Sequence, residues 1–454
     1  MKIQSIKRTV VFLLAAFMLL ILFGCGGNQA GADKTAGTST AVAQNSTAAA
    51  TPQPTETPKT KLSVMSWWDI SKATALQQLK AKFEEQNPNI ELDFPMIGKG
   101  YATKLLTMIA SGGNDIPDVA MLAADKLPMF ASKGAVLDLS GYITDQYKKD
   151  TYPMVQNACT FGGKTYAVAR DVTSMVMFCN TKMFSDAKVD LPSNNWTIDQ
   201  FLDIAKKLTK VDANGKPVQW GYYFAKYEDT MYDWLLLNGG DYATADGKQS
   251  LLGSAGTKAG FQFMQDLIYK YKVCPTDTQA KQFGDDDSAP IVAGKVAMTI
   301  GGLSMSVAFD TATPKVEYAL RPLPLSKDGK RISHAFVNTW TIPKGAKNPD
   351  LSWKVLEFFS GKDGQQIVLD NNMGLPANKS VDTTKFLATH PDNKYLMQSL
   401  DYAVPFRTLV YGADFYNMVR KELEPVWLNQ KSINDAVASM EAKAGDILAG
   451  NAQK

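Results

Sequence analysis

The sequence predicts an α/β fold with at least two lobes. The chain has 454 residues, which exceeds the size at which a single hydrophobic core usually stops growing. Residues 61–122 alternate between apolar runs of strand length and segments with apolar residues at helical spacing. This alternation is typical of a parallel sheet with helices on its faces. In such sheets, ligands bind at the carboxyl ends of the strands.

The first segment supplies five elements in order. The helical segments are marked by Leu76, Leu79 and Phe83 in the first and by a terminal glycine pair in the second. Strands are expected at 61–67, 90–97 and 117–122, and helices at 75–88 and 101–113.

The rest of the chain continues with mixed elements. Thr197 is a plausible N-cap for one helix, and Gly361 a plausible C-cap for another. No internal repeat is visible. We expect extended segments at 162–180, 212–224, 295–302, 316–325 and 335–343, and helices at 196–210, 257–273, 349–361 and over most of the chain from 412.

The N-terminus carries the pattern of an export signal. Basic residues fall within 1–8, an apolar run fills 9–23, and the small residue Gly24 stands before Cys25. A cysteine at this point resembles a bacterial lipoprotein signal, which implies cleavage of residues 1–24 and a lipid anchor (diacylglyceryl and palmitate) on the Cys25 thiol. The alternative is an uncleaved membrane anchor, but the run is shorter than the ~20 residues that span a bilayer comfortably.

Residues 25–60 are rich in Gly, Ala, Ser, Thr, Gln and Pro. Such a composition cannot bury enough apolar surface to fold, so we expect a disordered tether. Together with the signal, it predicts a protein held outside the cytoplasm on the bacterial cell membrane.

Charge and rare residues exclude several classes of site. The net charge of +3 equals the contribution of Lys2, Lys7 and Arg8, so the remainder is neutral and nucleic acid is not expected as a partner. The chain has two histidines, which leaves little material for a histidine-rich metal site, and we expect neither metal nor cofactor. The acidic turns at 212–215 and 284–288 lack the full pattern of a calcium loop.

Beyond Cys25, the cysteines are few and widely spaced. One disulfide is possible in an exported protein, but buried free thiols are the preferred interpretation. The cysteines concerned are Cys159, Cys179 and Cys274.

The order of segments resembles one family. After the signal and tether come "LKAKFEEQNPNIELDF", "GGNDIPDVAML", "GAVLDLSGYI", "GGKTYAVARDVTSMVMFCNTKMF", "NWTIDQFLDIAKKL", "AGKVAMTIGG", "YALRPLP", "TWTIPKGAKNPDLSWKVLEFFSG" and "NNMGLPANKS". This set is similar to the extracellular solute-binding proteins of carbohydrate-uptake ABC transporters, in the branch with maltose- and glycerol-phosphate-binding proteins. The resemblance covers the chain from about Lys61 onward.

That resemblance implies a two-lobed periplasmic-binding-protein-like fold with the solute in an interlobe cleft and several hinge crossings. It implies a monomer that captures a sugar or oligosaccharide and delivers it to a membrane permease. The chain has no phosphate-cradling G-x-x-x-x-G-K-[ST] loop, so it is not expected to hydrolyse ATP itself. We expect no enzyme activity. The expected lobes are residues 61–170 plus 342–390 and residues 171–341 plus 391–454.

A sugar presents weakly apolar C–H faces and many hydroxyls, so its site needs aromatic rings beside polar side chains. Trp67, Trp68 and Asp69 follow the first strand and meet this need. Because neighbouring side chains of a strand point to opposite faces, one tryptophan is expected to face the cleft. We favour Trp68 as the stacking surface and Asp69 as an acceptor for hydroxyls, with strand-end packing as the alternative.

Other candidates occur at strand ends and at the expected crossings. Each has a structural alternative, such as a helix cap for Asp125, an interlobe ion pair for Arg170 and Asp171, or core packing for the tryptophans. Gly302 is expected to let the backbone approach the solute, since Leu303 and Ser304 stand where the family often has a tryptophan. The full set adds Asp125, Arg170, Asp171, Trp234, Gly302, Asn338, Trp340 and Tyr411.

Three other functions compete with sugar import. An exported carbohydrate-active enzyme would use paired carboxylates, for which Asp69 and Asp171 are the available pair. A glycerol-phosphate or other anionic solute would need converging cations, and Arg170 and Arg407 are the central candidates. A surface adhesin would need no closing cleft.

Overall fold

The computed structural model describes residues 58–284 and 288–451. The signal peptide, Cys25 and nearly all of the expected tether therefore lie outside the described residues. Within them, buried apolar side chains gather into two hydrophobic cores. Among the described residues, no helix combines the length and the apolar character that a membrane crossing requires.

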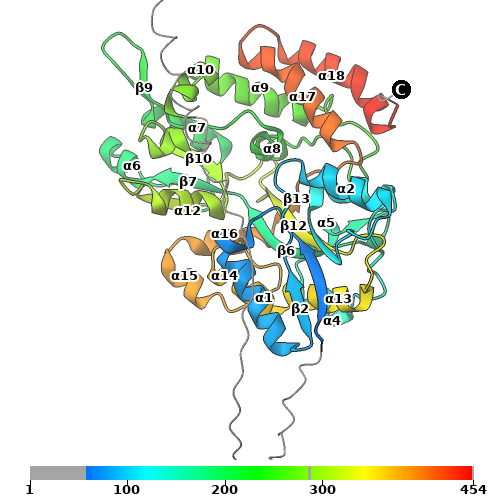
Figure 1. Ribbon diagram of the computed structural model, residues 1–454. Helices are drawn as coiled ribbons and strands as arrows, with labels where there is room; N and C mark the ends of the chain where they lie inside the picture. Colours follow the sequence, from blue (N-terminus) through cyan, green and yellow to red (C-terminus); the bar gives the residue numbers. More distant parts are fainter. Residues whose placement is uncertain (1–57, 285–287, 452–454) are drawn as a thin grey trace, which may run out of the picture. The chain divides into compact units, whose positions relative to one another are not determined.

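The larger sheet belongs to the first core and has six strands (Figure 1). Its order is β13, β12, β3, β1, β2, with β6 as a further partner of β12. Strand β1 is parallel to β2 and β3, whereas β12 is antiparallel to β3 and β6. The bounds are β1 Thr60–Met65, β2 Ile90–Asp93, β3 Val119–Ala123, β6 Val168–Ser174, β12 Ser333–Thr341 and β13 Ala403–Pro405.

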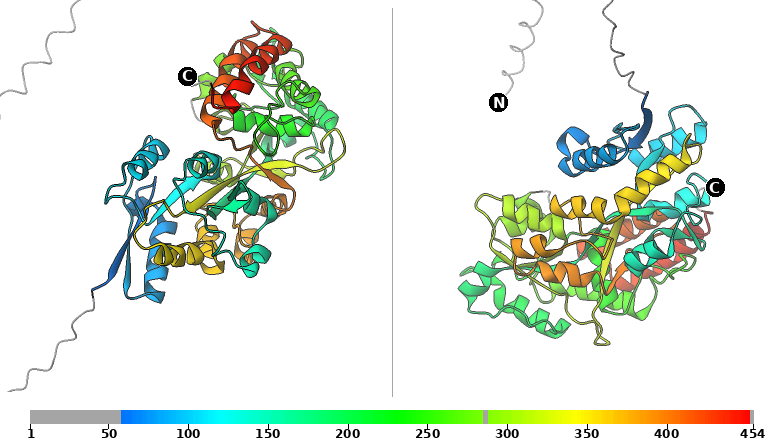
Figure 2. Two further views of the ribbon diagram at one scale, coloured as in Figure 1. Left: turned by 90° about the vertical axis from the view of Figure 1, so that its right-hand side faces the viewer. Right: turned by 90° about the horizontal axis from the view of Figure 1, so that it is seen from below.

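Strand β12 positions much of the site. Its register places Asn338 opposite Ala123 and Thr341 opposite Ala120, so the middle of β12 lies beside the carboxyl end of β3. On its other side, Asn338 lies opposite Asp171 of β6, but Thr339 lies opposite Ala169. One residue of β6 is thus bulged out of the ladder, and this β-bulge brings Arg170 and Asp171 to the same point. Figure 2 shows β12, in yellow, running from the blue strands toward the green helices.

Helices cover the first core because each presents one apolar face to it. In α1, Phe83 packs its ring against Phe358 and Phe359 of α13, at centroid distances of 5.7 and 6.4 Å. The helix ends at Gln86, just before Pro88, which disfavours helical backbone in the preceding residue. The helices are α1 Thr74–Gln86, α2 Tyr101–Ser111, α3 Leu127–Ser132, α4 Asp145–Asp150, α5 Pro153–Ala158, α13 Pro349–Ser360, α14 Lys362–Asp370, α15 Thr384–Thr389 and α16 Asn393–Ser399, with 3-10 turns η1 Ile70–Lys72 and η2 Ala124–Lys126 and a hairpin of β4 Thr160–Phe161 and β5 Lys164–Thr165.

The second core is mainly helical, and an antiparallel sheet in the order β10, β7, β11 lies between the two cores. Met177 and Cys179 of β7 belong to the second core, whereas Phe178 of β7 and Leu320 of β11 belong to the first. Helix α7 begins where expected, because Thr197 and Gln200 form a capping box. The remaining elements of the described chain are β7 Val176–Asn180, β10 Met298–Gly301, β11 Tyr318–Arg321, α6 Thr181–Ala187, α7 Ile198–Leu208, α8 Glu228–Leu237, α9 Ala255–Tyr269, α10 Asp277–Ala280, α11 Ala289–Val292, α12 Leu303–Thr311, α17 Gly412–Trp427 and α18 Ile433–Leu448, with η3 Lys281–Phe283 and a hairpin of β8 Lys210–Val211 and β9 Pro217–Gln219. Of these, α11 and α12 pack their buried apolar side chains in the first core.

The α/β fold class is confirmed, with corrections at single elements. The expected strand at 90–97 ends at Asp93, and the aromatic strand expected at 212–224 is reduced to the short β9. Beyond β9 the pairing continues only as isolated parallel bridges, Trp220 with Val296 and Tyr223 with Thr299, so this segment lies beside β10 without forming a regular strand. Cys159, Cys179 and Cys274 are buried free thiols. The lobe boundaries stay a prediction.

Candidate ligand-binding site

Two adjoining hollows, of about 210 and 470 Å³, lie at the carboxyl end of β3 and share Asp125, Phe336 and Phe406. We call them together the groove. One wall comes from β3, β6 and β12, and the other from the start of α8 and from α17. The residues that carry the argument are Asp125, Thr173, Phe336, Asn338, Tyr227, Glu228, Asp229 and Arg420.

Asp125 was predicted from its position after a strand, and it lines both hollows. It sits in the 3-10 turn η2, whose N-cap is Ala123, so Asp125 is not the cap of this turn. Its side chain is 27% exposed and pairs with Lys126 at 2.6 Å. The carboxylate therefore has an exposed edge that could accept hydrogen bonds from a solute.

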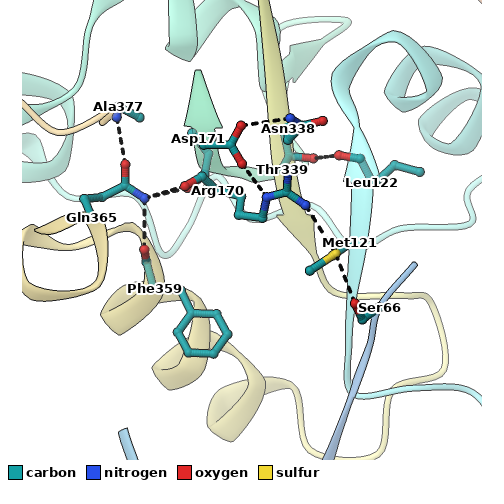
Figure 3. A network of polar contacts seen from close by, with 11 residues as sticks. Ser66, Met121, Leu122, Arg170, Asp171, Asn338, Thr339, Phe359, Gln365 and Ala377 are labelled. Carbon is teal, nitrogen blue, oxygen red and sulfur yellow. Dashed lines mark hydrogen bonds and ion pairs between the residues drawn. The ribbon is translucent and has the colours of Figure 1, made fainter. Parts of the chain in front are cut away.

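Arg170 and Asp171 form a buried ion pair on the sheet side of the groove (Figure 3). Each is 1% exposed. The Arg170 guanidinium lies over the rings of Trp67 and Trp68, at 4.9 and 4.4 Å from their centroids. The positive charge of Arg170 is thus compensated by the carboxylate of Asp171 and by the faces of the two tryptophan rings. Both charges are used within the protein.

Asn338 connects this pair to the groove. Its Nδ2 donates to Oδ1 of Asp171 at 2.8 Å (Figure 3). Because that bond fixes the amide, the other end of Asn338 is held in the groove wall. No described residue donates to its Oδ1. Asn338 therefore offers a solute an oriented acceptor.

Trp68 is 39% exposed, whereas Trp67 is half-buried against Tyr101 at a centroid distance of 5.3 Å. Ser66 fixes this end of the strand, since its hydroxyl accepts from the Trp68 N–H and donates to the Trp68 carbonyl, both at 2.9 Å. Trp68 does not line the groove. It is connected to the groove wall by a chain of contacts, because Arg170 lies over its ring, Asp171 pairs with Arg170, and Asn338 donates to Asp171. The exposed indole fits a stacking surface at the edge of the site.

Asp69 lies in a different setting from the one expected. It is the N-cap of η1, and its Oδ1 accepts from the backbone N–H and the hydroxyl of Ser71, at 3.0 and 2.7 Å. The Ser71 hydroxyl, followed by the Ser71 backbone N–H, lowers the pKa of Asp69. The carboxylate serves its own turn and does not line the groove.

Three expected aromatic contacts are corrected, two by burial of the ring and one by its position. Trp234 has no exposed area and donates from Nε1 to the Tyr222 hydroxyl at 2.8 Å, inside the second core. Trp340 also has none and packs on Phe359 at 5.1 Å, because β12 turns this side chain under the sheet. Tyr411 lies against Gly450, after α18, and is outside the groove. These rings present no face to a solute in the groove.

Gly302 lies in the wall of a smaller cavity that adjoins the groove. A Cβ at this position would come within 2.5 Å of Cγ2 of Thr173. The glycine is therefore required by the close approach of the backbone after β10 to β6. This explains the residue by packing, and it leaves the expected approach to a solute as a prediction.

The sequence interpretation missed the start of α8. Tyr227 is its N-cap and is 51% exposed, and Glu228 and Asp229 follow in the first turn. Acidic residues are favourable there because the helix N-terminus carries partial positive charge. Arg420 of α17 pairs with Glu228 at 2.8 Å. An exposed tyrosine followed by two acids, directly before an apolar helix, was the available signal.

No metal site accompanies the groove: within residues 58–284 and 288–451, no three His, Cys, Asp or Glu side chains come together so as to hold an ion. The site instead combines aromatic surfaces with oriented acceptors. Its cations, Lys126 and Arg420, are both paired with acids.

Comparisons with known proteins agree with this arrangement. The family model of the bacterial extracellular solute-binding proteins matches residues 67–366. A maltooligosaccharide ABC transporter solute-binding lipoprotein of Streptococcus pneumoniae is 27% identical over 282 residues, which cover 60% of this chain and 62% of that protein.

Solved structures share the fold. An ABC substrate-binding protein of Listeria monocytogenes in complex with cycloalternan superposes with a TM-score of 0.73 at 23% identity, covering 86% of this chain and 99% of that one. A solute-binding protein of Thermotoga lettingae bound to α-D-tagatose gives a TM-score of 0.71 at 21% identity, covering 86% and 100%. At these identities, the likeness establishes the fold.

Proposed function

We propose, from the premise that this chain belongs to the bacterial extracellular solute-binding protein family, that it captures a sugar or oligosaccharide in the groove and delivers it to an ABC transporter permease. The observation that carries the proposal is the pairing of exposed acceptors with aromatic surfaces on both walls. Asp125 and Asn338 stand on one wall, and Asp229 with Tyr227 on the other. Sugar hydroxyls suit such acceptors, and C–H faces suit the rings.

Trp68 adds a surface at the edge of the site. One side of the indole is held by Arg170, and 39% of the residue is exposed. The pneumococcal relative, whose name gives maltooligosaccharide as its solute, supports a carbohydrate ligand. Its name also supports the predicted lipid anchor at Cys25, which would keep the protein beside the permease.

Charge disfavours an anionic solute. Arg170 is neutralised by Asp171, and Arg407 is paired with Asp241 outside the groove. Lys126 and Arg420 already hold acids of the groove. A phosphate would have to break one of these pairs before it gained a cation, whereas a neutral sugar would not.

The carboxylates named for catalysis are also engaged. Asp69 caps its own turn, and Asp171 is buried between Arg170 and Asn338. Neither is placed to exchange a proton with a solute in the groove. This supports capture without turnover.

Titration calorimetry against a panel of monosaccharides and oligosaccharides tests the proposal. We expect saturable heat with at least one sugar, no product by chromatography after prolonged incubation, and compaction in small-angle scattering when that sugar is added. Turnover of a bound sugar would favour the enzyme alternative. Binding of glycerol phosphate but of no neutral sugar would favour the anionic alternative.

A further inference from the structure

A cavity of about 180 Å³ adjoins the groove and has an acidic wall. We call it the acidic cavity. Its polar side is formed by Asp229 and Asp233 of α8 and by His334 of β12, and its aromatic side by Tyr222 and Tyr223. Asp229 also lines the groove, so the two spaces share a wall. Ser304 lines the same cavity.

The two carboxylates lie four residues apart on α8, on the same face of the helix. No lysine or arginine lines the cavity. In the part of the chain that the structure describes, neither aspartate forms an ion pair with a lysine or an arginine. The other groove acids differ, since Asp125 has Lys126 and Glu228 has Arg420.

Lys226 lies three residues before Asp229 in the sequence, but its charge is compensated elsewhere. Its Nζ lies over the rings of Tyr223 and Phe224 and pairs with Asp277 at 2.8 Å. It is absent from the cavity wall. The negative charge of Asp229 therefore stands without a protein cation.

His334 supplies an independent observation. The residue is 1% exposed, and its backbone N–H donates to Oδ1 of Asp233 at 2.8 Å. Its Nδ1 lies 3.0 Å from Oδ2 of Asp233, yet neither ring nitrogen has a partner in hydrogen-bond geometry among the described residues. Buried polar groups are normally satisfied, so an unpartnered imidazole in a cavity wall points to a missing ligand. His334 lies beside Asp233 and not beside Asp229, whose Oδ1 accepts only from the backbone N–H of Thr230, at 2.9 Å, among the described residues.

We infer that the acidic cavity receives an ammonium group, and that the preferred solute is an amino sugar or an oligosaccharide that contains one. The ammonium would neutralise Asp229, donate to the acceptors of Asp233 and His334, and lie against the faces of Tyr222 and Tyr223. This inference rests on the proposed function, because it names the class of sugar that the same site takes.

The test compares sugars in matched pairs by titration calorimetry. Glucosamine, galactosamine and mannosamine are each measured against the parent sugar, and the glucosamine trimer against its N-acetylated form and cellotriose. We expect the tightest amine to bind about tenfold more tightly than its neutral counterpart, as one charge-assisted hydrogen bond would give. If neutral sugars bind and amines bind no better, this inference fails while the proposed function stands. If none of these sugars binds and the wider panel is also silent, both fail.

A matched pair of variants locates the effect. Asp229→Asn removes one charge from the second position of α8 but keeps the shape, and Asp199→Asn does the same at the second, exposed position of α7. We expect Asp229→Asn to abolish most of the preference for the amine, measured as the ratio of the amine affinity to the neutral-sugar affinity of the same variant, because a loss of acceptor strength toward hydroxyls would weaken both sugars and cancel in that ratio. Asp199→Asn should leave this ratio unchanged. An unchanged preference in Asp229→Asn would overturn the inference.

Discussion

The two walls of the groove carry similar side chains in opposite electrostatic states. On the sheet wall, Arg170 and Asp171 neutralise each other, and Asn338 and two tryptophans complete their contacts. On the wall formed by α8, no lysine or arginine among the described residues forms an ion pair with Asp229, and none lines the acidic cavity. A charge that the protein satisfies by itself contributes to a rigid frame. A charge without a partner in the protein is available to a ligand. Whether a charged residue has such a partner therefore distinguishes a structural role from a binding role better than the type of residue does.

The largest effect on stability is expected when the buried ion pair of Arg170 and Asp171 is broken. Arg170→Met keeps the length of the side chain but leaves the Asp171 carboxylate buried without its cation. We expect the free energy of unfolding to fall by about 3 to 5 kcal/mol, because an uncompensated buried charge is costly. Urea denaturation followed by tryptophan fluorescence measures it. The double variant Arg170→Met/Asp171→Asn should recover part of the loss, and a change below about 1 kcal/mol in the single variant would contradict the comparison.

A smaller effect, on binding instead of stability, is expected at Asp125. Its carboxylate is partly exposed in both hollows, so Asp125→Asn should weaken binding of the best neutral sugar by about tenfold, the value of one charge-assisted hydrogen bond. The control is Asp69→Asn, which removes the same charge from a carboxylate committed to Ser71. We expect the control to bind within about twofold of the parent protein. Equal losses in both variants would show that overall charge, not the groove, sets the affinity.

Trp68 tests whether the frame also supplies a binding surface. Trp68→Ala removes an indole that stacks on Arg170, which should cost about 1 kcal/mol of stability, as cation–π contacts do. If the exposed face stacks on a sugar, calorimetry should show a loss of affinity of about tenfold or more, a larger free energy than the loss of stability. If the variant binds the sugar normally but is less stable, Trp68 has a structural role and does not contact the sugar.

The outline of this site follows from local rules. Asp125 was predicted because ligands gather at the carboxyl ends of strands, and the structure places it in the wall of both hollows. The strand alternation also foretold that Trp67 and Trp68 would have different environments. Both inferences use only neighbours in sequence, and that is why they could be made without the fold.

What the sequence could not give depends on distant contacts. The bulge of β6 lies opposite Asn338 and Thr339 of β12, a strand that is distant in the sequence, and no local pattern predicts it. The buried state of Trp340 depends on α13, whose Phe359 covers it. Asp229 becomes part of the site only because α8 packs near the end of β3, roughly a hundred residues away along the chain. In each case the environment of the residue depends on which distant segments pack around it, and the type of residue alone does not determine it.

The smallest effect is expected for an acid that is compensated at the surface of the second core. Glu422 of α17 accepts from Lys431 at 2.7 Å and also from Lys443 of α18. These two bonds lower the pKa of Glu422 from its ordinary value of 4.5 to about 2. Because the pKa is lower in the folded protein, the stabilisation is complete above about pH 4.5 and is lost as the pH falls toward 2.

Unscreened, this pKa shift would correspond to roughly 3 kcal/mol at pH 7. Because the side chains of Lys431 and Lys443 are 26% and 53% exposed and solvent screens both bonds, we expect Glu422→Gln to cost about 1 kcal/mol. Its stability should also fall less steeply between pH 4.5 and 2 than that of the parent protein, since the titrating group is gone. Urea melts at a series of pH values measure both quantities. Affinity for the best neutral sugar at pH 7 should be unchanged, because Glu422 does not line the groove. A loss at pH 7 as large as that of Arg170→Met would mean that exposure does not separate the two kinds of compensated charge.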